Sequence, residues 1–308
     1  MHELSQRYRD GHTRDTTPFL QTSVDVAAYA AFRLPATFAA ATAALREVRD
    51  LRPDFRPRGV LDAAGGLGTA SWAAAEIWPT VEHTEVLERD EHMIRLGQSL
   101  AAHAHSPALR AAGWRQIDIT AEWSMDSADL VILGYALGEL AAESRDTVMR
   151  RLWAHTDDTV LVLEPGTPRG SALIRQAGDL LVNEDAAVVA PFPWDWVCIE
   201  NERDWCHFAA RVSRTRLHRS VKGAALSHKD EKYAYVAASR TPGLPIAARV
   251  IRHPQIRSGH VRLTLCTAAG VKHVVVTRKN REAFRRARDL AWGSAIEPAE
   301  APLFGLAD

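Results

Sequence analysis

A glycine-rich turn between a predicted strand and a predicted helix is the segment best suited to bind a ligand. Gly59 to Ala70 reads G-V-L-D-A-A-G-G-L-G-T-A, so an apolar run leads through Gly65, Gly66 and Gly68 into a small-residue stretch. Glycine lets the backbone come close to a ligand, and the start of the following helix offers unpaired N–H groups. The pattern predicts a nucleotide-type cofactor at this turn.

An acidic residue follows where such a cofactor needs it. Glu88 comes twenty residues after Gly68, at the end of the next predicted strand. A carboxylate at that position accepts hydrogen bonds from a ribose diol. The alternative is a tight turn that binds nothing, and Glu88 argues against it.

The spacing of the turn separates two cofactor classes. A nicotinamide dinucleotide site needs G-x-G-x-x-G, but Ser71 stands where the third glycine should be. The class I S-adenosylmethionine motif D-x-G-x-G-x-G fits residues 62–68, except that Ala64 replaces the first glycine and can crowd the amino-acid end of the cofactor. Asp118 closes the third strand, where class I methyltransferases contact the adenine amino group. We therefore expect S-adenosylmethionine at Asp62, Ala64, Gly66, Gly68, Glu88 and Asp118.

The end of the fourth predicted strand is where methyltransferases place groups that act on the methyl acceptor. Here it reads Gly134-Tyr135-Ala136-Leu137, not the Asn- or Asp-Pro-Pro-aromatic tetrad of nucleobase N-methylases. Tyr135 can stack on adenine or an acceptor and Glu139 can act as a base, but the residues alone favour the simpler interpretation, a buried tyrosine and a helix-capping glutamate. Methyl transfer from a sulfonium can run on proximity and orientation, so the sequence leaves catalysis open.

Short apolar runs that alternate with helix-compatible segments predict an α/β fold with a parallel sheet. The predicted strands are Gly59–Asp62, Glu82–Leu87, Trp114–Ile119, Leu130–Leu133, Val160–Leu163, Cys206–Val212 and Lys232–Ala238. The predicted helices are Ala70–Ile77, Met93–Ala104, Ser144–Ala154 and Ala172–Asn183.

We expect three parts along the chain: a helical N-terminal element (1–57), a seven-stranded Rossmann-like methyltransferase domain (58–240) and a small β-rich C-terminal unit (241–308). Pro35 is expected to open a second helix of the first part, because proline is tolerated in a first helical turn. The third part is expected to be antiparallel, with strands at Ala248–Ile251, Val261–Cys266 and His273–Thr277 and a basic helix at Arg281–Trp292.

The charges are balanced overall but not along the chain. Of 308 residues, 38 are Lys or Arg and 38 are Asp or Glu. Between Arg203 and Arg288, however, 20 basic residues face four acids, a net of +16, and all five lysines lie there. A solvated face is one explanation and a phosphate-binding face is the other. For the second, the expected RNA contacts are Arg214, Arg216, Arg219, Lys222, Arg278 and Lys279.

Composition and cysteine count exclude several classes of protein. The 46% hydrophobic and 25% charged residues are ordinary for a globular chain and exclude disorder and coiled coils. Three cysteines without an apolar leader do not suggest a secreted disulfide framework. No window reaches the ~18 apolar residues that a membrane span requires. We expect a soluble, cytoplasmic protein with reduced cysteines.

Motifs spread over nearly the whole chain resemble the methyltransferase-like family of mitochondrial small-ribosomal-subunit assembly factors and their bacterial relatives. They include A-Y-A-A-F-R-L-P-A-T-F (28–38), L-E-R-D (87–90), L-G-E-L (137–140), E-P-G-T-P (164–168), W-C-H-F (205–208) and A-R-D-L-A-W-G (287–293). The resemblance implies a class I methyltransferase fold, association with small-subunit ribosomal RNA and, in mitochondrial members, a four-cysteine [4Fe–4S] cluster.

Cys198, Cys206 and Cys266 match the last three family cysteines, and Phe192 stands at the first. Either the cysteines are core residues, or three thiolates hold a cluster whose fourth iron takes another ligand. Zinc is a further possibility for three cysteines plus a histidine, but His207 adjoins Cys206 in a predicted strand and should point to the opposite face.

The predicted cofactor site, the basic segment and the family resemblance combine into one functional expectation. The chain is expected to bind S-adenosylmethionine and to associate with small-subunit ribosomal RNA in ribosome assembly or translation, with methyl transfer left open. The alternative is a free-standing methyltransferase that acts on a small molecule.

Overall fold

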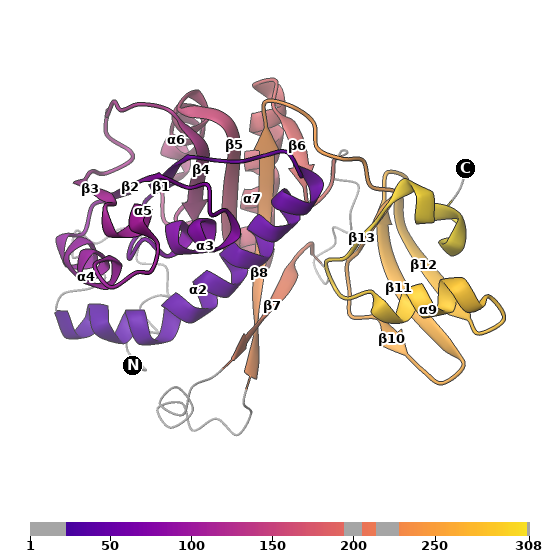
Figure 1. Cartoon of the computed structure of the whole chain (residues 1–308). Helices are drawn as coiled ribbons and strands as arrows, with labels where there is room; N and C mark the ends of the chain where they lie inside the picture. Colours follow the sequence, from indigo (N-terminus) through magenta and orange to yellow (C-terminus); the bar gives the residue numbers. More distant parts are fainter. Residues whose placement is uncertain (1–22, 194–204, 214–227, 307–308) are drawn as a thin grey trace.

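An eight-stranded sheet forms the centre of the protein (Figure 1). The structure, a computed structural model, describes residues 23–193, 205–213 and 228–306. The strand order is β3-β2-β1-β4-β5-β8-β6, and β7 pairs with β8 outside this path. The strands are β1 (Gly59–Ala63), β2 (His83–Glu88), β3 (Gly113–Gln116), β4 (Ala128–Gly134), β5 (Thr156–Pro165), β6 (Ala187–Ala190), β7 (Phe208–Ser213) and β8 (His228–Ser239).

Strands β3, β2, β1, β4 and β5 are parallel, and β8 runs antiparallel to both β5 and β6. A parallel set followed by one reversed strand is the class I methyltransferase arrangement, so the expected fold class is confirmed. The expected count of seven strands was wrong by one. The additional strand is β6, a four-residue run that pairs with β8 and therefore depends on a partner about 50 residues further along the chain.

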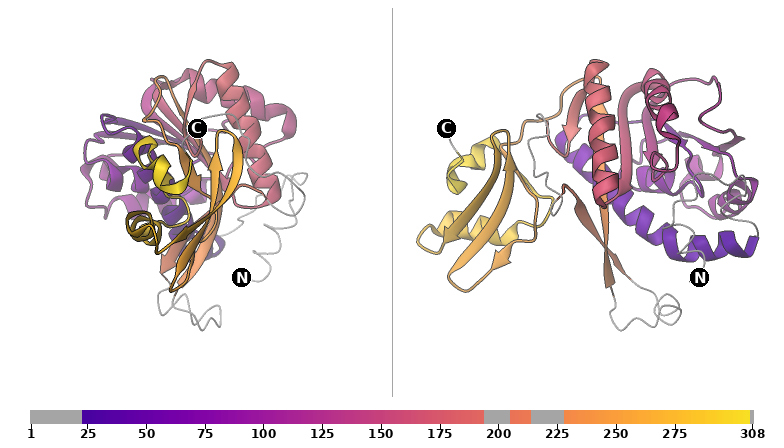
Figure 2. Two further views of the ribbon diagram at one scale, coloured as in Figure 1. Left: turned by 90° about the vertical axis from the view of Figure 1, so that its right-hand side faces the viewer. Right: turned by 180° about the vertical axis from the view of Figure 1, so that it is seen from behind.

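Helices cover both faces of the sheet (Figure 2). Alternate residues of each strand point to opposite faces, so Val60 packs with α2 (Ser23–Leu51) and α3 (Thr69–Ile77), while Leu61 packs with α6 (Ala142–Ala154) and α7 (Pro168–Asn183). Helix α4 (Glu91–Ala101) and the short α5 (Pro107–Arg110) lie near β2 and β3. The two buried clusters place the sheet at the centre of the core.

Helix α2 is continuous through Pro35, so the predicted opening of a second helix there was wrong. A proline inside a helix leaves the carbonyl four residues earlier without its partner. Here that residue is Ala31, which is exposed, so water can satisfy the carbonyl. Burial of Ala40, Ala44 and Val48 against the sheet stabilises the second half of the helix.

The C-terminal unit is the small antiparallel sheet expected from the sequence. It consists of β9 (Ala248–Val250), β10 (Gln255–Ile256), β11 (His260–Thr267), β12 (Gly270–Thr277) and β13 (Ala295–Ile296), with α9 (Arg281–Asp289) and a 3₁₀ helix, η1 (Pro298–Phe304). Strands β11 and β12 form its longest ladder. The apolar side chains of α9 and η1, including Phe284 and Phe304, cover the inner face of this sheet.

A buried arginine joins this unit to the rest of the protein. Arg249 in β9 is fully buried, and its guanidinium forms an ion pair with Glu47 of α2. It also donates to the Pro191 carbonyl from Nε (2.5 Å) and to the Gly293 carbonyl from Nη1 (2.6 Å). One side chain thus connects α2, the turn after β6 and the C-terminal unit.

Replacing Arg249 with alanine should lower the free energy of unfolding by about 3–5 kcal/mol, because it leaves Glu47 and two carbonyls without their buried partner. Urea denaturation of the variant and the parent measures this loss. Arg46→Ala is the control, since Arg46 pairs with Glu76 at the surface and such pairs contribute about 0–1 kcal/mol. Equal losses in the two variants would contradict a joining role for Arg249.

Candidate functional site

The strand order fixes where a ligand can bind. From β1 the strand order runs to β2 and β3 on one side, and from β4 it runs to β5 on the other, so β1 and β4 form the switch point of the sheet. Ligands of open α/β sheets bind beyond the carboxyl ends of the strands at such a point. The register pairs Ala63 with Leu133. Ala64 and Gly134, the next residues, therefore flank the crevice. A Cβ added to Gly134 would meet no atom within 4 Å, so this side of the crevice is open.

The glycine turn has the backbone conformation that its sequence suggested. Gly66 and Gly68 have positive φ angles of 57° and 72°, and Ala64 has a φ of 49°. This left-handed conformation costs about 1–2 kcal/mol for a residue with a Cβ. The substitution of the first motif glycine by Ala64 therefore strains the turn but keeps its path.

Asp62 lies beneath the turn rather than in the crevice. It is 1% exposed, and its Oδ2 accepts hydrogen bonds from both N–H and Oγ–H of Ser71, each at 3.0 Å. Burial raises the pKa of Asp62 to about 6. A Cβ on Gly65 would lie 2.8 Å from its carboxyl carbon, so Asp62 needs glycine at that position. Its role is to hold the turn against α3.

Glu88 braces the same turn from the end of β2. Its Oε2 accepts a hydrogen bond from the Gly66 N–H at 2.9 Å, and its Oε1 accepts one from the Asp90 N–H at 2.8 Å. Burial raises the pKa of Glu88, although these hydrogen bonds oppose the rise. Each carboxylate oxygen has a second lone pair, so both oxygens can still accept from ribose hydroxyls.

Asp118 lies two residues beyond β3 and is exposed. Its Oδ1 accepts hydrogen bonds from the Thr120 N–H (2.9 Å) and hydroxyl (2.7 Å). The structure thus places Asp62, Ala64, Gly66, Gly68 and Glu88 around one turn, with Asp118 on a neighbouring loop. Binding by these residues stays a prediction.

The end of β4 contains both candidate catalytic residues. Tyr135 is buried and has a φ of 62°, and the guanidinium carbon of Arg33 lies 5.5 Å from its ring centroid. Glu139 is exposed, yet desolvation of its carboxyl by neighbouring groups raises its pKa, with Arg89 opposing the rise and Glu88 adding to it. Their catalytic roles stay predictions.

Glu164 is a buried acid that the sequence analysis did not single out as a site residue. It ends the apolar run of β5, is 3% exposed and accepts a hydrogen bond from the Gly138 N–H at 3.1 Å. Arg169 donates to the Gly138 carbonyl at 2.7 Å, so both the N–H and the carbonyl of Gly138 are hydrogen-bonded. A carboxylate directly after four buried apolar residues was the signal that could have identified it.

Helix α2 lies over the glycine turn. Val26 of α2, Leu67 of the turn and Met93 of α4 form a buried cluster, against which Ala30 and Leu34 also pack. Next to them, Arg33 forms an ion pair with Glu231 of β8 at 3.0 Å. The first half of α2 therefore borders the crevice on the side of β1 and β4.

The described cysteines lie in an apolar joint. Cys266 is fully buried and disulfide-bonded, so the expected reduced state was wrong for this cysteine. Cys206 is in the thiol form and packs against the same core cluster, while Cys198 lies outside the described residues. Phe192 is 1% exposed, with its ring centroid 6.3 Å from that of Phe208.

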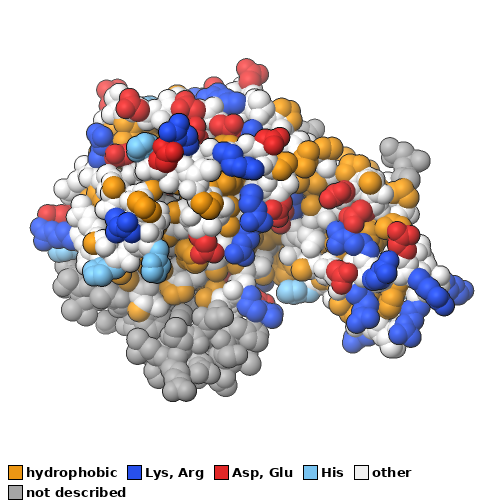
Figure 3. All heavy atoms as spheres, viewed as in Figure 1, with side chains coloured by type: hydrophobic (Ala, Val, Ile, Leu, Met, Phe, Trp, Pro, Cys, Tyr) orange, Lys and Arg blue, Asp and Glu red, His pale blue; other side chains and the backbone are white. Residues whose placement is uncertain are grey.

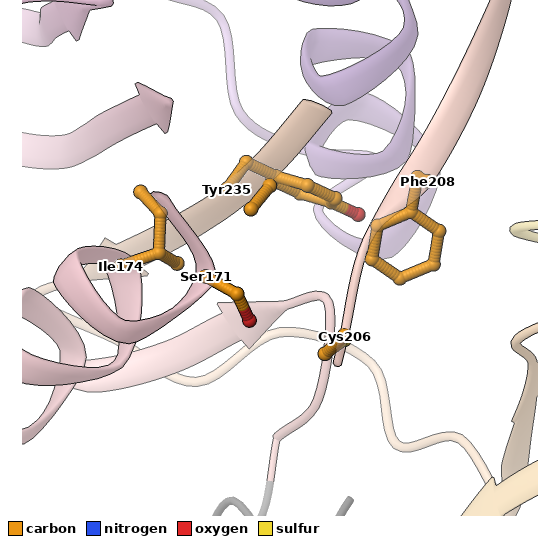
Figure 4. A pocket seen from close by; sticks show the side chains of 6 residues that line it. Ser171, Ile174, Cys206, Phe208 and Tyr235 are labelled. Carbon is orange, nitrogen blue, oxygen red and sulfur yellow. The ribbon is translucent and has the colours of Figure 1, made fainter. Parts of the chain in front are cut away.

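The described residues around Cys206 pack closely. Cys206 borders a cavity of about 10 Å³, no larger than one water molecule, with Phe208 and Tyr235 on its other sides (Figure 4). No group of three or more metal-ligating side chains is found in the described part of the chain. Cys198, the third expected ligand, lies outside the described residues, so the predicted iron–sulfur and zinc sites stay predictions.

Basic side chains gather on the C-terminal unit (Figure 3). Arg278, Lys279, Arg281, Arg285 and Arg288 are exposed, and none forms an ion pair with another described residue. Arg285 and Arg288, with Phe284 and Asp289, line a surface hollow of about 340 Å³. Of the six predicted RNA contacts, Arg214, Arg216, Arg219 and Lys222 lie outside the described residues.

Comparison with known proteins identifies the family. A family model described as "Mitochondrial small ribosomal subunit Rsm22" matches residues 23–297. The chain belongs to the Rsm22 family. Among the described residues of this member, no helix combines the length and apolar character that a membrane crossing requires.

The curated relatives are longer proteins. Human "Ribosome assembly protein METTL17, mitochondrial" is 28% identical over 87% of this chain and 61% of its own length. "Rsm22-cox11 tandem protein 2, mitochondrial" of Schizosaccharomyces pombe is 25% identical over 94% of this chain and 45% of its own length. The chain thus spans less than two thirds of each. Among solved structures, magnesium protoporphyrin IX methyltransferase from Synechocystis aligns with a TM-score of 0.44 and 15% identity, over 77% of this chain and 91% of that one.

Glu164 should make the stability of the protein depend on pH. Burial raises its pKa from 4.5 to about 7, so the folded state holds the proton more tightly than the unfolded state. Stability should therefore fall as the pH rises from about 4.5 to 7 and then level off.

The free energy of unfolding of the parent should fall between pH 5 and pH 8, and Glu164→Gln should reduce that fall by about 2 kcal/mol. Urea unfolding at several pH values measures it, with the exposed Glu76→Gln as the control. An unchanged pH profile in Glu164→Gln would rule out this account.

Proposed function

We propose that this Rsm22-family protein binds S-adenosylmethionine at the switch-point crevice and contacts RNA of the small ribosomal subunit through its C-terminal unit. Membership of a family described as a small-ribosomal-subunit protein is the observation that carries the ribosomal part. The name of the human relative as a ribosome assembly protein supports a role in assembly. Both relatives are named as mitochondrial, so the cytoplasmic location expected from the sequence stays a prediction.

The geometry of the crevice supports the cofactor part. The turn after β1 has the left-handed positions of the motif, Glu88 is held at the end of β2, and the side of Gly134 is open. These residues fit a nucleoside with an attached amino acid. When bound, the cofactor supplies an electrophilic sulfonium methyl group, and this chain's residues position it. Tyr135 and Glu139 stay candidates for contact with an acceptor.

The C-terminal helix supports the RNA part. Arg281, Arg285 and Arg288 are spaced by four and three residues, so they lie on one face of α9. Guanidinium groups that pair with no acid in the described part of the chain, on an exposed helix face, suit phosphate oxygens, to which arginine binds in a bidentate manner. Arg286, in contrast, is paired with Glu300 at 2.5 Å and serves the fold.

Glu88→Ala should weaken binding of S-adenosylmethionine by about 1–3 kcal/mol, because it removes charge-assisted hydrogen bonds to the ribose and the brace on Gly66. Isothermal titration calorimetry measures the affinity. Glu85→Ala is the matched control, since Glu85 lies on the same strand but points to the other face, where it pairs with Arg115. Absence of heat from the folded parent protein at millimolar ligand would overturn the cofactor assignment.

Replacing Arg281, Arg285 and Arg288 together with glutamine should weaken binding to a small-subunit RNA fragment and lower the slope of log affinity against log salt by about 2–3. Filter binding at several salt concentrations gives the slope. A triple variant at Arg46, Arg58 and Arg95, which are each in an exposed ion pair, is the control. Salt-insensitive or undetectable RNA binding by the parent would favour the alternative, a small-molecule methyltransferase.

A further inference from the structure

We infer that Arg33 binds the carboxylate at the amino-acid end of the cofactor. The inference rests on the proposed binding of S-adenosylmethionine and assigns one more residue of the same site. It comes from the place of Arg33 in the fold: the side chain belongs to α2, but its guanidinium lies over Tyr135, the residue that follows β4.

The location of the amino-acid end follows from the strand register. Glu88 fixes the ribose end beside β2, so the rest of the cofactor extends across β1 toward β4. Ala64 and Gly134 are adjacent at these strand ends, and Tyr135 comes next along the chain. The guanidinium over Tyr135 therefore lies at the end of β4. The glycine turn at the end of β1 separates it from the ribose end at β2.

The surroundings of Arg33 hold it there. Its Nη1 donates to Glu231 at 3.0 Å, and Lys229 lies 3.6 Å from the other oxygen of the same carboxylate. Arg33 and Lys229 thus contact the same carboxylate, which holds the guanidinium in place. The Arg33 side chain is 27% exposed, so it is anchored but still reachable by a ligand.

Helix α2 links this cation to the glycine turn. Ala30 and Leu34 flank Arg33 on the helix and pack in the cluster that contains Leu67 of the turn. The glycine turn and Tyr135 are therefore both in contact with side chains of the same helix. A carboxylate is the group of the cofactor that a guanidinium recognises, and the pair can be bidentate.

A comparison of three ligands tests this assignment. S-adenosylmethionine and S-adenosylhomocysteine have the carboxylate, whereas 5′-methylthioadenosine has the same nucleoside without the amino acid. Arg33→Gln should lower the affinity for the first two about tenfold or more and leave that for methylthioadenosine unchanged. Arg33→Lys should recover part of the loss. Calorimetry measures all affinities, and thermal unfolding checks that each variant is folded.

Two further variants separate the possible failures. Arg46→Gln, on the same helix but in a surface ion pair with Glu76, should change no affinity, whereas Glu88→Ala should weaken all three ligands. Glu231→Gln keeps Arg33 but loosens its orientation, and should weaken only the two carboxylate ligands. Equal losses for all three ligands in Arg33→Gln, or no loss, would overturn the role of Arg33 while leaving the cofactor site intact. Failure of the parent to bind any of the three would overturn both.

Discussion

The arrangement of the whole molecule depends on one buried charge. Arg249 has no exposed surface, and its guanidinium holds Glu47, the Pro191 carbonyl and the Gly293 carbonyl. A charge in the interior is costly unless it is paired and hydrogen-bonded. Each partner comes from a different segment, so the energy of that charge is lowest only when α2, the turn after β6 and the C-terminal unit are all in place. The orientation of the basic helix relative to the crevice follows from this constraint.

A second constraint is the placement of acids at the carboxyl ends of the strands. Asp62, Glu88 and Glu164 lie at or next to the last residue of β1, β2 and β5. Each accepts a backbone N–H hydrogen bond, from the start of α3, the glycine turn and the loop after β4, respectively. The buried carboxylates thus use their acceptor capacity to shape loops. This explains why no evident acid–base pair stands out in the crevice: most of the acids act on the backbone, and a ligand meets the surface that they hold in shape.

Local patterns in the sequence predicted much of this fold, and distant pairings explain the rest. The glycine turn and the apolar runs of β1 to β5 are local signals, and the turn conforms to them even at Ala64. The continuity of α2 through Pro35 was not predictable in this way, because it depends on an exposed carbonyl at Ala31 and on burial of the next turns against the sheet. Glu164 and Arg33 acquire their positions from Gly138 and Tyr135, respectively, and such contacts between loops and helices have no local signature.

The strand order also has a consequence for synthesis on the ribosome. Strand β5 has β8 as its neighbour, and β6 pairs with β8 rather than with any strand made before it. The growing chain therefore carries an open edge on β5 and an unpaired β6 until residue 239 has emerged. Glu47, made early, waits still longer for Arg249. Because open strand edges attract other chains, the nascent protein passes through a long stage in which it must be shielded, and the C-terminal unit later completes the contacts of helix α2.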